Sequence, residues 1–255
     1  MLRRLDSLRH WEIFARDGRA GKIDDFYFDD HHWVVRYLVA DTGLWLSGRK
    51  VLIAPQALGK PDWPNRTLLV NLTREQIEKS PDVAADQPVS RQKETELYRY
   101  YGWESPYWLT VGHQTGPTPP IPPAQSPLQP AGGPFPVRSK EEIDPRLRSV
   151  RELIGYRMRG RDEAAGSIAD LLADDEDWSI RYLLVDTGHW LPGRKVLIPP
   201  TEARELHWED KTIDVDLSRE KIRDSPEYEP SAPVEGDYQD RLHNFFGWPK
   251  YWRRR

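Results

Sequence analysis

The residues of this 255-residue sequence that could carry out acid–base chemistry occur twice, 145 positions apart. The recurring set comprises Asp41, Arg36 and Arg49-Lys50, with the counterparts Asp186, Arg181 and Arg194-Lys195. A carboxylate beside cations could act as a catalytic acid or base, but that role also needs a hydrogen-bonded partner and a pocket. Because both copies keep these residues beside turn glycines, we interpret them as turn caps and surface ion pairs. We therefore predict no catalytic residue and expect a protein that is not an enzyme.

Acidic clusters and a histidine pair are the candidates for metal ligands. The acidic residues gather at Asp24-Asp25, Asp29-Asp30, Asp170 and Asp174-Asp175-Glu176-Asp177. They lack the glycine and the closing glutamate of a calcium loop, so we predict solvated turns. His31-His32 suggests zinc, but the second copy has Glu176-Asp177 there, and adjacent strand residues point to opposite faces. We expect no metal ion and no cofactor.

The duplication fixes the domain organisation. The sequence from Gly21 to Pro81 returns from Gly166 to Pro226 without a gap, and a repeat of this kind indicates two copies of one fold. The residues that match most clearly between the copies, which we interpret as a structural motif, are Asp41, Gly43, Trp45, Gly48, Asp186, Gly188, Trp190 and Gly193. Proline is dense between the copies, which favours an extended, semi-rigid spacer. We predict domains at residues 1–109 and 141–255, joined by a linker at 110–140.

Each copy reads as mainly β. In the first copy, the runs 11–15, 22–28, 34–40, 50–53 and 67–72 have the composition or alternation of strands. Asp41-Thr42-Gly43 predicts a tight turn, because the aspartate can cap it and the glycine tolerates a positive φ. Thr73 and Gln76 have the spacing of a capping box, which predicts a short helix ending near Ser80-Pro81. Many short strands with one short helix favour a small barrel.

These residues resemble the PRC-barrel family, found in the cytoplasmic part of the photosynthetic reaction centre H subunit and in the ribosome maturation factor that assists 16S rRNA processing. The resemblance lies in the Gly-x-Ile-x-Asp opening, the Arg-Tyr-Leu strand and the Lys-Val-Leu-Ile-x-Pro segment that ends at Pro55 and Pro200. It covers roughly residues 8–82 and 153–227. It implies a mainly β fold of two tandem PRC-type β-barrels, each with a short helix and an aromatic tail.

Aromatic residues are the best candidates for an interaction surface. Each copy ends in a box of rings, and the residues we select are Trp103, Tyr107, Trp108, Trp248, Tyr251 and Trp252. Trp33, Trp45 and Trp63 also recur in the second copy. A small barrel cannot bury so many rings in one core, so some must pack outside it. Either each tail covers its own barrel, or the rings contact the other barrel or a partner.

Composition limits the remaining choices. The net charge is −4, which argues against a chain built around a polyanion, and cysteine is absent, which suits a reducing compartment. No signal peptide or membrane span is evident, so we expect a cytoplasmic protein. The favoured function is non-enzymatic protein interaction or scaffolding, with the two barrels paired or a homo-oligomer formed. RNA or ribosome association, or an accessory role in photosynthetic electron transport, are the alternatives that the resemblance implies. Specific activity is expected where the copies differ, as at His31-His32, or on the surface that duplication created.

Overall fold

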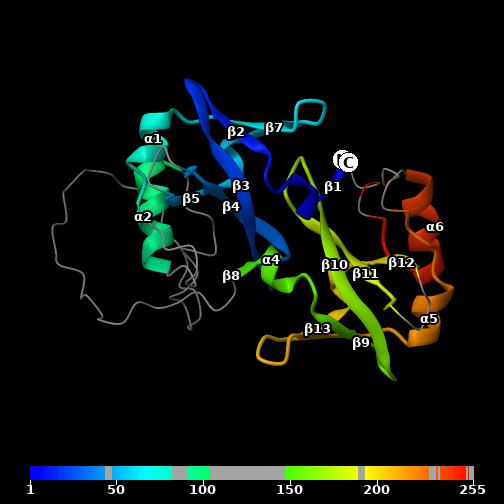
Figure 1. Ribbon diagram of the computed structural model, residues 1–255. Coiled ribbons are helices and arrows are strands. Elements are labelled where there is room, and N and C mark those ends of the chain that lie inside the picture. The colour runs from blue at the N-terminus through cyan, green and yellow to red at the C-terminus, as the bar shows by residue number, and fades with distance from the viewer. Residues whose placement is uncertain are drawn as a thin grey trace, which may run out of the picture.

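The computed structural model describes residues 1–43, 48–81, 91–103, 147–188, 193–229, 234, 236–250 and 252. Two seven-stranded sheets dominate it, one for each copy of the repeat (Figure 1). The first contains β2 (Glu12–Ala15), β3 (Gly18–Asp29), β4 (Val34–Asp41), β5 (Lys50–Ile53), β6 (Leu58–Asp62), β7 (Thr67–Val70) and β8 (Leu147–Ser149). The second contains β1 (Leu2–Arg4), β9 (Arg157–Arg159), β10 (Ala164–Asp174), β11 (Ile180–Asp186), β12 (Lys195–Ile198), β13 (Ala203–His207) and β14 (Thr212–Val215).

Short helices join and flank these sheets. They are α1 (Arg74–Glu78), α2 (Arg91–Tyr101), α4 (Val150–Leu153), α5 (Arg219–Asp224) and α6 (Gly236–Phe246), with 3₁₀ turns η1 (Asp6–Leu8), η3 (Pro55–Ala57) and η5 (Pro200–Glu202). Figure 1 shows α2 and α6 at opposite ends of the molecule, each covering the outer side of its own sheet. In the described part of the chain, no helix is long and apolar enough to cross a membrane.

The two sheets have the same strand order. It runs β5-β4-β3-β2-β7-β6 in the first and β12-β11-β10-β9-β14-β13 in the second. Neighbours are antiparallel except for the parallel pairs β2–β7 and β9–β14. The prediction of a mainly β, tandem fold is thus confirmed. Within the described residues, the strands at the two ends of each sheet are not paired with each other, so the expected closure of a barrel is not seen in the hydrogen bonding.

The local predictions that concern turns and caps are confirmed. The Asp41 carboxylate accepts the amide of Gly43 at 2.8 Å, and Thr73 and Gln76 form a complete capping box at the start of α1. The requirement for glycine at the start of the Gly-x-Ile-x-Asp opening also has a physical explanation. Gly21 has a φ of 135°, and a Cβ there would lie 2.2 Å from the carbonyl oxygen of Asp41. Only glycine allows β3 to approach β4 so closely at this point.

The two copies exchange strands. β1, which precedes the first copy, pairs antiparallel with β10 of the second, while β8, which precedes the second copy, pairs with β3 of the first. Leu2 faces Asp174 and Leu147 faces Asp29, so both pairings have the same register at the 145-residue offset. In Figure 1 the blue β1 lies beside β10 and the green β8 beside the blue strands of the first sheet. The copies are therefore related by a pseudo-twofold axis, like the subunits of an isologous dimer.

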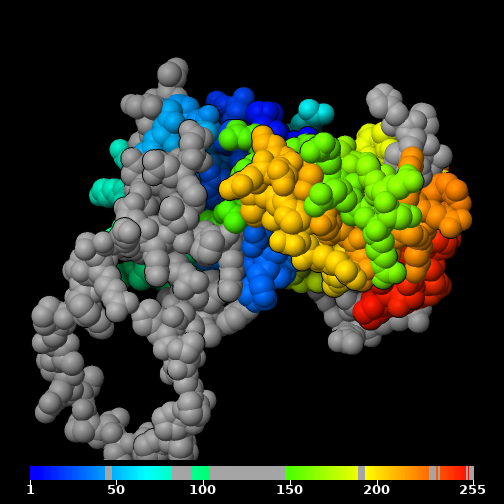
Figure 2. Space-filling model, turned by 90° about the horizontal axis from the view of Figure 1, so that it is seen from below, coloured from blue at the N-terminus to red at the C-terminus, as the bar shows by residue number. Residues whose placement is uncertain are grey.

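The axis passes between β4 and β11. Val34 forms a bridge with Ser179, its own counterpart in the repeat. The amide of Val35 donates to the carbonyl oxygen of Trp178 at 2.9 Å, and the amide of Ile180 donates to that of Trp33 at 2.7 Å. One apolar core runs through both halves, and Figure 2 shows them as one continuous mass. The expected pairing of the two domains is confirmed.

Two aspartates of the acidic clusters hold the exchanged segments, which corrects the prediction that these clusters are solvated turns. Asp25 is buried and accepts hydrogen bonds from the Ser149 hydroxyl and the Arg151 amide, at 2.5 and 3.1 Å. Asp170, its counterpart, accepts the Asp6 amide at 3.0 Å and the Arg4 guanidinium at 2.8 Å. Burial raises the pKa of both carboxyls, although these donors act in the opposite direction. The acids are inside because each binds the segment that the other copy contributes.

Candidate functional site

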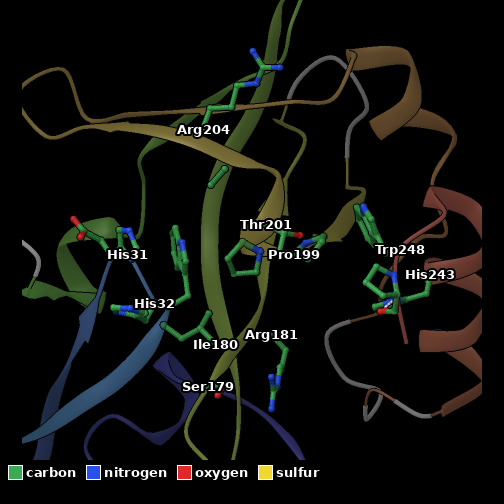
Figure 3. A pocket seen from close by; sticks show the side chains of 15 residues that line it. His31, His32, Ser179, Ile180, Arg181, Pro199, Thr201, Arg204, His243 and Trp248 are labelled. Carbon is green, nitrogen blue, oxygen red and sulfur yellow. Dashed lines mark hydrogen bonds between the residues drawn. The ribbon is translucent and has the colours of Figure 1, made fainter. Parts of the chain in front are cut away.

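A groove of about 610 Å³ lies at the interface between the two copies. One wall is the turn at residues 30–33 of the first copy, the floor is the start of β11, and the far wall combines residues 199–204 with His243, Trp248 and Pro249 (Figure 3). Its volume is that of a small-ligand or peptide-side-chain pocket. Figure 3 shows His31 and His32 on one side and His243 and Trp248 on the other. Neither copy contains this groove alone, since each supplies part of it.

The near wall is the turn that the sequence singled out. The buried Asp29 carboxylate accepts the amides of His31 and His32, both at 2.9 Å, and thereby fixes the turn. Burial acts to raise the pKa of Asp29, but these amides hold it below its ordinary value. The two imidazole rings lie 4.7 Å apart. The prediction that they point to opposite faces is therefore wrong, because they belong to a turn and not to a strand.

Trp33 completes this wall in an unusual backbone conformation. Its φ is 53°, in the left-handed region that bulky residues rarely adopt. The same is true of Trp178, with a φ of 57°. In each case the tryptophan carbonyl oxygen accepts a hydrogen bond across the interface, so the strain is stabilised by contact between the copies. Trp33 is only partly buried and lines the groove, whereas Trp178 is buried and stacks on Phe26 of the first copy.

The charged side chains that line the groove have partners. The Asp30 carboxylate binds Arg148 at 3.1 Å, and the Arg181 guanidinium binds Asp177 at 2.5 Å. Arg204 binds Asp216 at 2.6 Å, and Figure 3 shows it extending away from the other labelled side chains. The groove is therefore a cleft of mixed character, with apolar side chains and ion pairs along its walls.

His243 belongs to the far wall and to a buried contact. Its Nε2 lies 2.6 Å from the Tyr182 hydroxyl, and its Nδ1 lies 2.9 Å from the carbonyl oxygen of Pro249. An Nδ1–H donating to Pro249 leaves Nε2 to accept the tyrosine proton, so this geometry suits a neutral imidazole. Burial lowers the pKa of His243, which agrees with a neutral ring. The sequence offered no usable spacing for this residue, because its partner lies 61 positions away.

The equivalent position of the first copy holds a different network. Arg36 is buried under α2, where its guanidinium binds Glu94 at 2.5 Å and Asp29 at 3.5 Å. Its side chain is 1% exposed, against 23% for Arg181. The interpretation of Arg36 as a surface ion pair is thus wrong, because α2 covers it. The Tyr37 hydroxyl donates to the same Glu94 oxygen at 2.8 Å, and burial followed by the nearby Glu94 charge raises the tyrosine pKa.

The aromatic tails fold back on their own copies as far as they are described. Trp103 packs on Tyr98 and Tyr101, with ring centroids 5.6 and 4.3 Å away. Trp248 stacks on Phe246 at 4.0 Å and donates its Nε1–H to Glu202, while Trp252 lies 4.6 Å from the His243 ring. Of the predicted surface residues, Trp248 is the one that lines the groove. Tyr107, Trp108 and Tyr251 lie outside the described residues.

The shared motif is structural where it is described. Asp186 caps Gly188 at 2.8 Å, as Asp41 caps Gly43, and Gly48 and Gly193 have φ values of 75° and 79°. Arg49 and Arg194 donate to the carbonyl oxygens of Ser80 and Ser225 beyond α1 and α5, so they bind backbone in the described part of the chain. Trp45 and Trp190 lie outside the described residues.

Two other matched tryptophans contact the exchanged segments. The Arg3 guanidinium lies 4.4 Å from the ring centroid of Trp63, and Arg148 lies 4.2 Å from that of Trp208. Cation–π contacts of this length stabilise the exchange. The many aromatic residues of the sequence thus lie partly in contacts between the copies and partly in contacts within the tails.

Within the described residues, no three His, Asp or Glu side chains converge in a way that could hold a metal ion. A second hollow, of about 490 Å³, lies beside Lys22, Asp41 and Arg74. The Asp41 carboxylate of this hollow already caps a turn, so the interface groove is the better candidate site. Thr201 and Pro199 of the groove were missed by sequence reasoning, because only the docking of the two copies brings them opposite the histidines.

Comparison with known proteins agrees with the repeated fold. The family model for the PRC-barrel domain matches residues 2–76 and 145–222, which is more than half of the chain. A protein of Deinococcus radiodurans, described only as an uncharacterized protein, is 30% identical over 76 residues. That match covers 29% of this chain and 27% of the relative, so the chain spans about a quarter of the relative's length. On the family match, the chain belongs to the PRC-barrel family.

Proposed function

We propose that this protein is a non-enzymatic interaction or scaffold protein that binds a segment of a partner protein in the groove between its two copies. One observation carries the proposal. The groove is a concave site at a domain interface, lined by apolar and polar side chains, and several residues that line it differ from their counterparts in the other copy. Binding sites concentrate at such interfaces.

The composition of the walls supports a protein partner. Trp33, Trp248 and Ile180 provide the large apolar surfaces that anchor protein contacts, and prolines provide rigid edges. Residues already held in place lose little conformational freedom on binding. Here Trp33 is fixed by the hydrogen bond that its carbonyl oxygen accepts from Ile180, and Trp248 by Glu202.

The charges of the second sheet favour protein over RNA as the partner. Along β9 and the turn after it, Arg159 binds Asp214 at 2.6 Å, and Arg161 binds Asp216. Arg219 likewise binds Glu163. A surface for nucleic acid presents its cations to phosphates, whereas these guanidinium groups are matched by carboxylates.

The side chains of the groove also support binding in preference to catalysis. A general acid or base must be free to exchange a proton with a substrate. His243 has both ring nitrogens in contact with protein atoms, and the Asp30 carboxylate is held by Arg148. The lack of cysteine suits a reducing compartment and so supports a cytoplasmic setting.

A pair of matched substitutions tests the proposal. Thr201 is exposed in the far wall of the groove, and Gln56 is the exposed residue 145 positions earlier. Thr201→Arg places a long side chain in the groove, whereas Gln56→Arg makes the same change at the equivalent site of the other copy. Partners are captured from a native extract with the wild-type protein and both variants, and quantified by mass spectrometry.

We expect a specific protein to be recovered by the wild type and by Gln56→Arg, and at least tenfold less of it by Thr201→Arg. Melting temperatures of the two variants within about 2 °C of each other establish that Thr201→Arg is folded. Equal recovery by all three proteins would show that binding does not use the groove. Repeated failure to recover any specific partner would remove the proposal.

A further inference from the structure

We infer that the groove recognises an acidic segment of its partner, in which aspartate or glutamate lies beside a large apolar residue. This inference rests on the proposed function and adds the chemistry of the ligand. It depends on the charges around the groove, on the apolar floor, and on the comparison with the equivalent residues of the other copy.

The fixed charges around the groove have partners. Asp30 is matched by Arg148 and Arg181 by Asp177, whereas Arg204 shares Asp216 with Arg161, so two guanidinium groups meet one carboxylate there. The buried Asp29 carboxylate lies beneath the histidine turn, 3.3 Å from His32 Nδ1. Across the groove, burial lowers the pKa of His243, although the hydrogen bond to the Pro249 carbonyl oxygen acts in the opposite direction.

His31 and His32 form the wall of the groove that differs most in character from the other copy, which has Glu176 and Asp177 in their place. Both rings stand at the near wall, 4.7 Å apart, and Figure 3 shows them opposite Pro199 and Trp248. A carboxylate that enters beside them meets the imidazole ring of His31, whose N–H can donate a hydrogen bond to it, while the Nδ1 of His32 lies 3.3 Å from Asp29.

The floor suits the apolar residue of the ligand. Ile180 lies on the floor, and Trp33 and Pro199 add apolar surface from the near and far walls. In an extended peptide, alternate side chains point to opposite sides, whereas neighbours in a turn share one side. A segment with an acid next to Leu or Phe can therefore place its carboxylate at the histidine wall and its apolar side chain on the floor.

The equivalent residues of the other copy have the opposite character. His31-His32 is replaced by Glu176-Asp177, and Arg204 by Gly59. An acidic ligand would be repelled there, although the backbone of the turn is the same, down to the left-handed tryptophan that ends it. The difference in charge thus selects one of two equivalent positions for an anionic partner.

Fluorescence polarisation with defined probes tests the inference. The acidic probe is a fluorescein-labelled octapeptide, Gly-Ser-Asp-Leu-Glu-Phe-Ser-Gly. A second peptide has lysine at both acidic positions, and a labelled uridine octanucleotide represents RNA. Binding to the full-length protein is measured at low and at physiological salt.

The double variant His31→Glu, His32→Asp is the decisive protein. It installs the residues that the second copy already carries in the same turn, and its melting temperature is compared with that of the wild type to establish that it is folded. Glu176→His is the control, since Glu176 is exposed on the other turn and does not line the groove. We expect the double variant to bind the acidic peptide at least tenfold more weakly than the wild type, and the control to leave binding unchanged.

Equal binding of the acidic and lysine peptides, no measurable binding of the acidic peptide, or an unchanged double variant would overturn the inference. So would equal binding of the oligonucleotide, which would point to polyanion recognition. If Thr201→Arg still loses the natural partner while the acidic peptide fails, the groove is a protein-binding site for another chemistry. If Thr201→Arg keeps the natural partner, the proposed function itself fails.

Discussion

The turn at residues 30–33 and the turn at residues 175–178 share a backbone but not a surface. Both end in a left-handed tryptophan whose carbonyl oxygen accepts a hydrogen bond from the opposite copy. In the first turn the two residues before the tryptophan are histidines, and in the second they are acids. The comparison shows that the interface fixes the residues that hold the copies together, while the side chains between those fixed points are free to differ.

The outer faces of the two sheets differ in the same way. Under α2, the first copy buries Arg36 with Glu94 and Tyr37. Under α6, the second copy places His243 on Tyr182, and the counterpart of Glu94 is Gln239. Both helices cover the same strand position, but one does so with an ion pair and the other with a neutral hydrogen bond. This contrast should appear in stability measurements.

The largest expected effect comes from breaking the ion pair of the first copy. Glu94→Gln keeps the shape of the side chain but removes the main counter-charge of the buried Arg36. We expect the free energy of unfolding to fall by about 3 kcal/mol, because an uncompensated charge is left inside. Gln239→Ala, at the equivalent place, should cost about 1 kcal/mol or less. Denaturant unfolding measures both, and equal losses would mean that the two faces do not differ in the way described.

The next prediction concerns residues at which the copies should be equivalent. Leu8 and Leu153 are counterparts in the repeat, both fully buried in the core that the exchanged segments complete. Leu8→Ala and Leu153→Ala should each cost about 3 kcal/mol, the usual range for a buried leucine. A difference of more than 1.5 kcal/mol between them, seen in urea unfolding, would show that the exchange is not symmetric in energy.

The smallest predicted effect is a difference in the pH dependence of stability, caused by His243 on the outer face of the second copy. Because burial lowers the pKa of His243, the unfolded chain binds a proton more readily than the folded one, so stability is lost as pH falls below the ordinary histidine value of about 6.5. Between pH 7.5 and pH 5.5 the wild type should lose about 2 °C of melting temperature more than His243→Tyr. That variant carries the residue of the first copy, Tyr98. The same slope in both proteins would exclude His243 as the cause.

Much of the fold could be predicted from the sequence, because its signals are local. The 145-residue repeat, the cap at Thr73 and the turn at Asp41 each depend on residues a few positions apart or on direct identity. The exchange of strands could not be predicted in this way. Leu2 and Leu147 stand in the same position relative to their copies. The sequence pattern is therefore the same whether each strand pairs within its own copy or with the other copy.

The site was predictable only in part. His31-His32 stood out because the copies differ there, and that difference does line the groove. The floor and the far wall were not foreseen, because they come from residues about 150 or more positions later in the chain that approach only when the copies dock. Arg36 was misread for a similar reason, since Glu94, which buries its charge, lies 58 positions away in a helix.

Strand exchange also has a consequence for synthesis. β1 emerges from the ribosome long before β10, the strand on which it must pair, and domains generally fold in the order in which they are made. The first copy therefore cannot complete its fold when its own residues have been synthesised, because β8 belongs to its sheet and follows the proline-rich segment. Both copies should reach their final state in one late step, and a nascent chain that stalls before β8 would expose the free edge of β3 at Tyr27–Asp29 to other nascent chains.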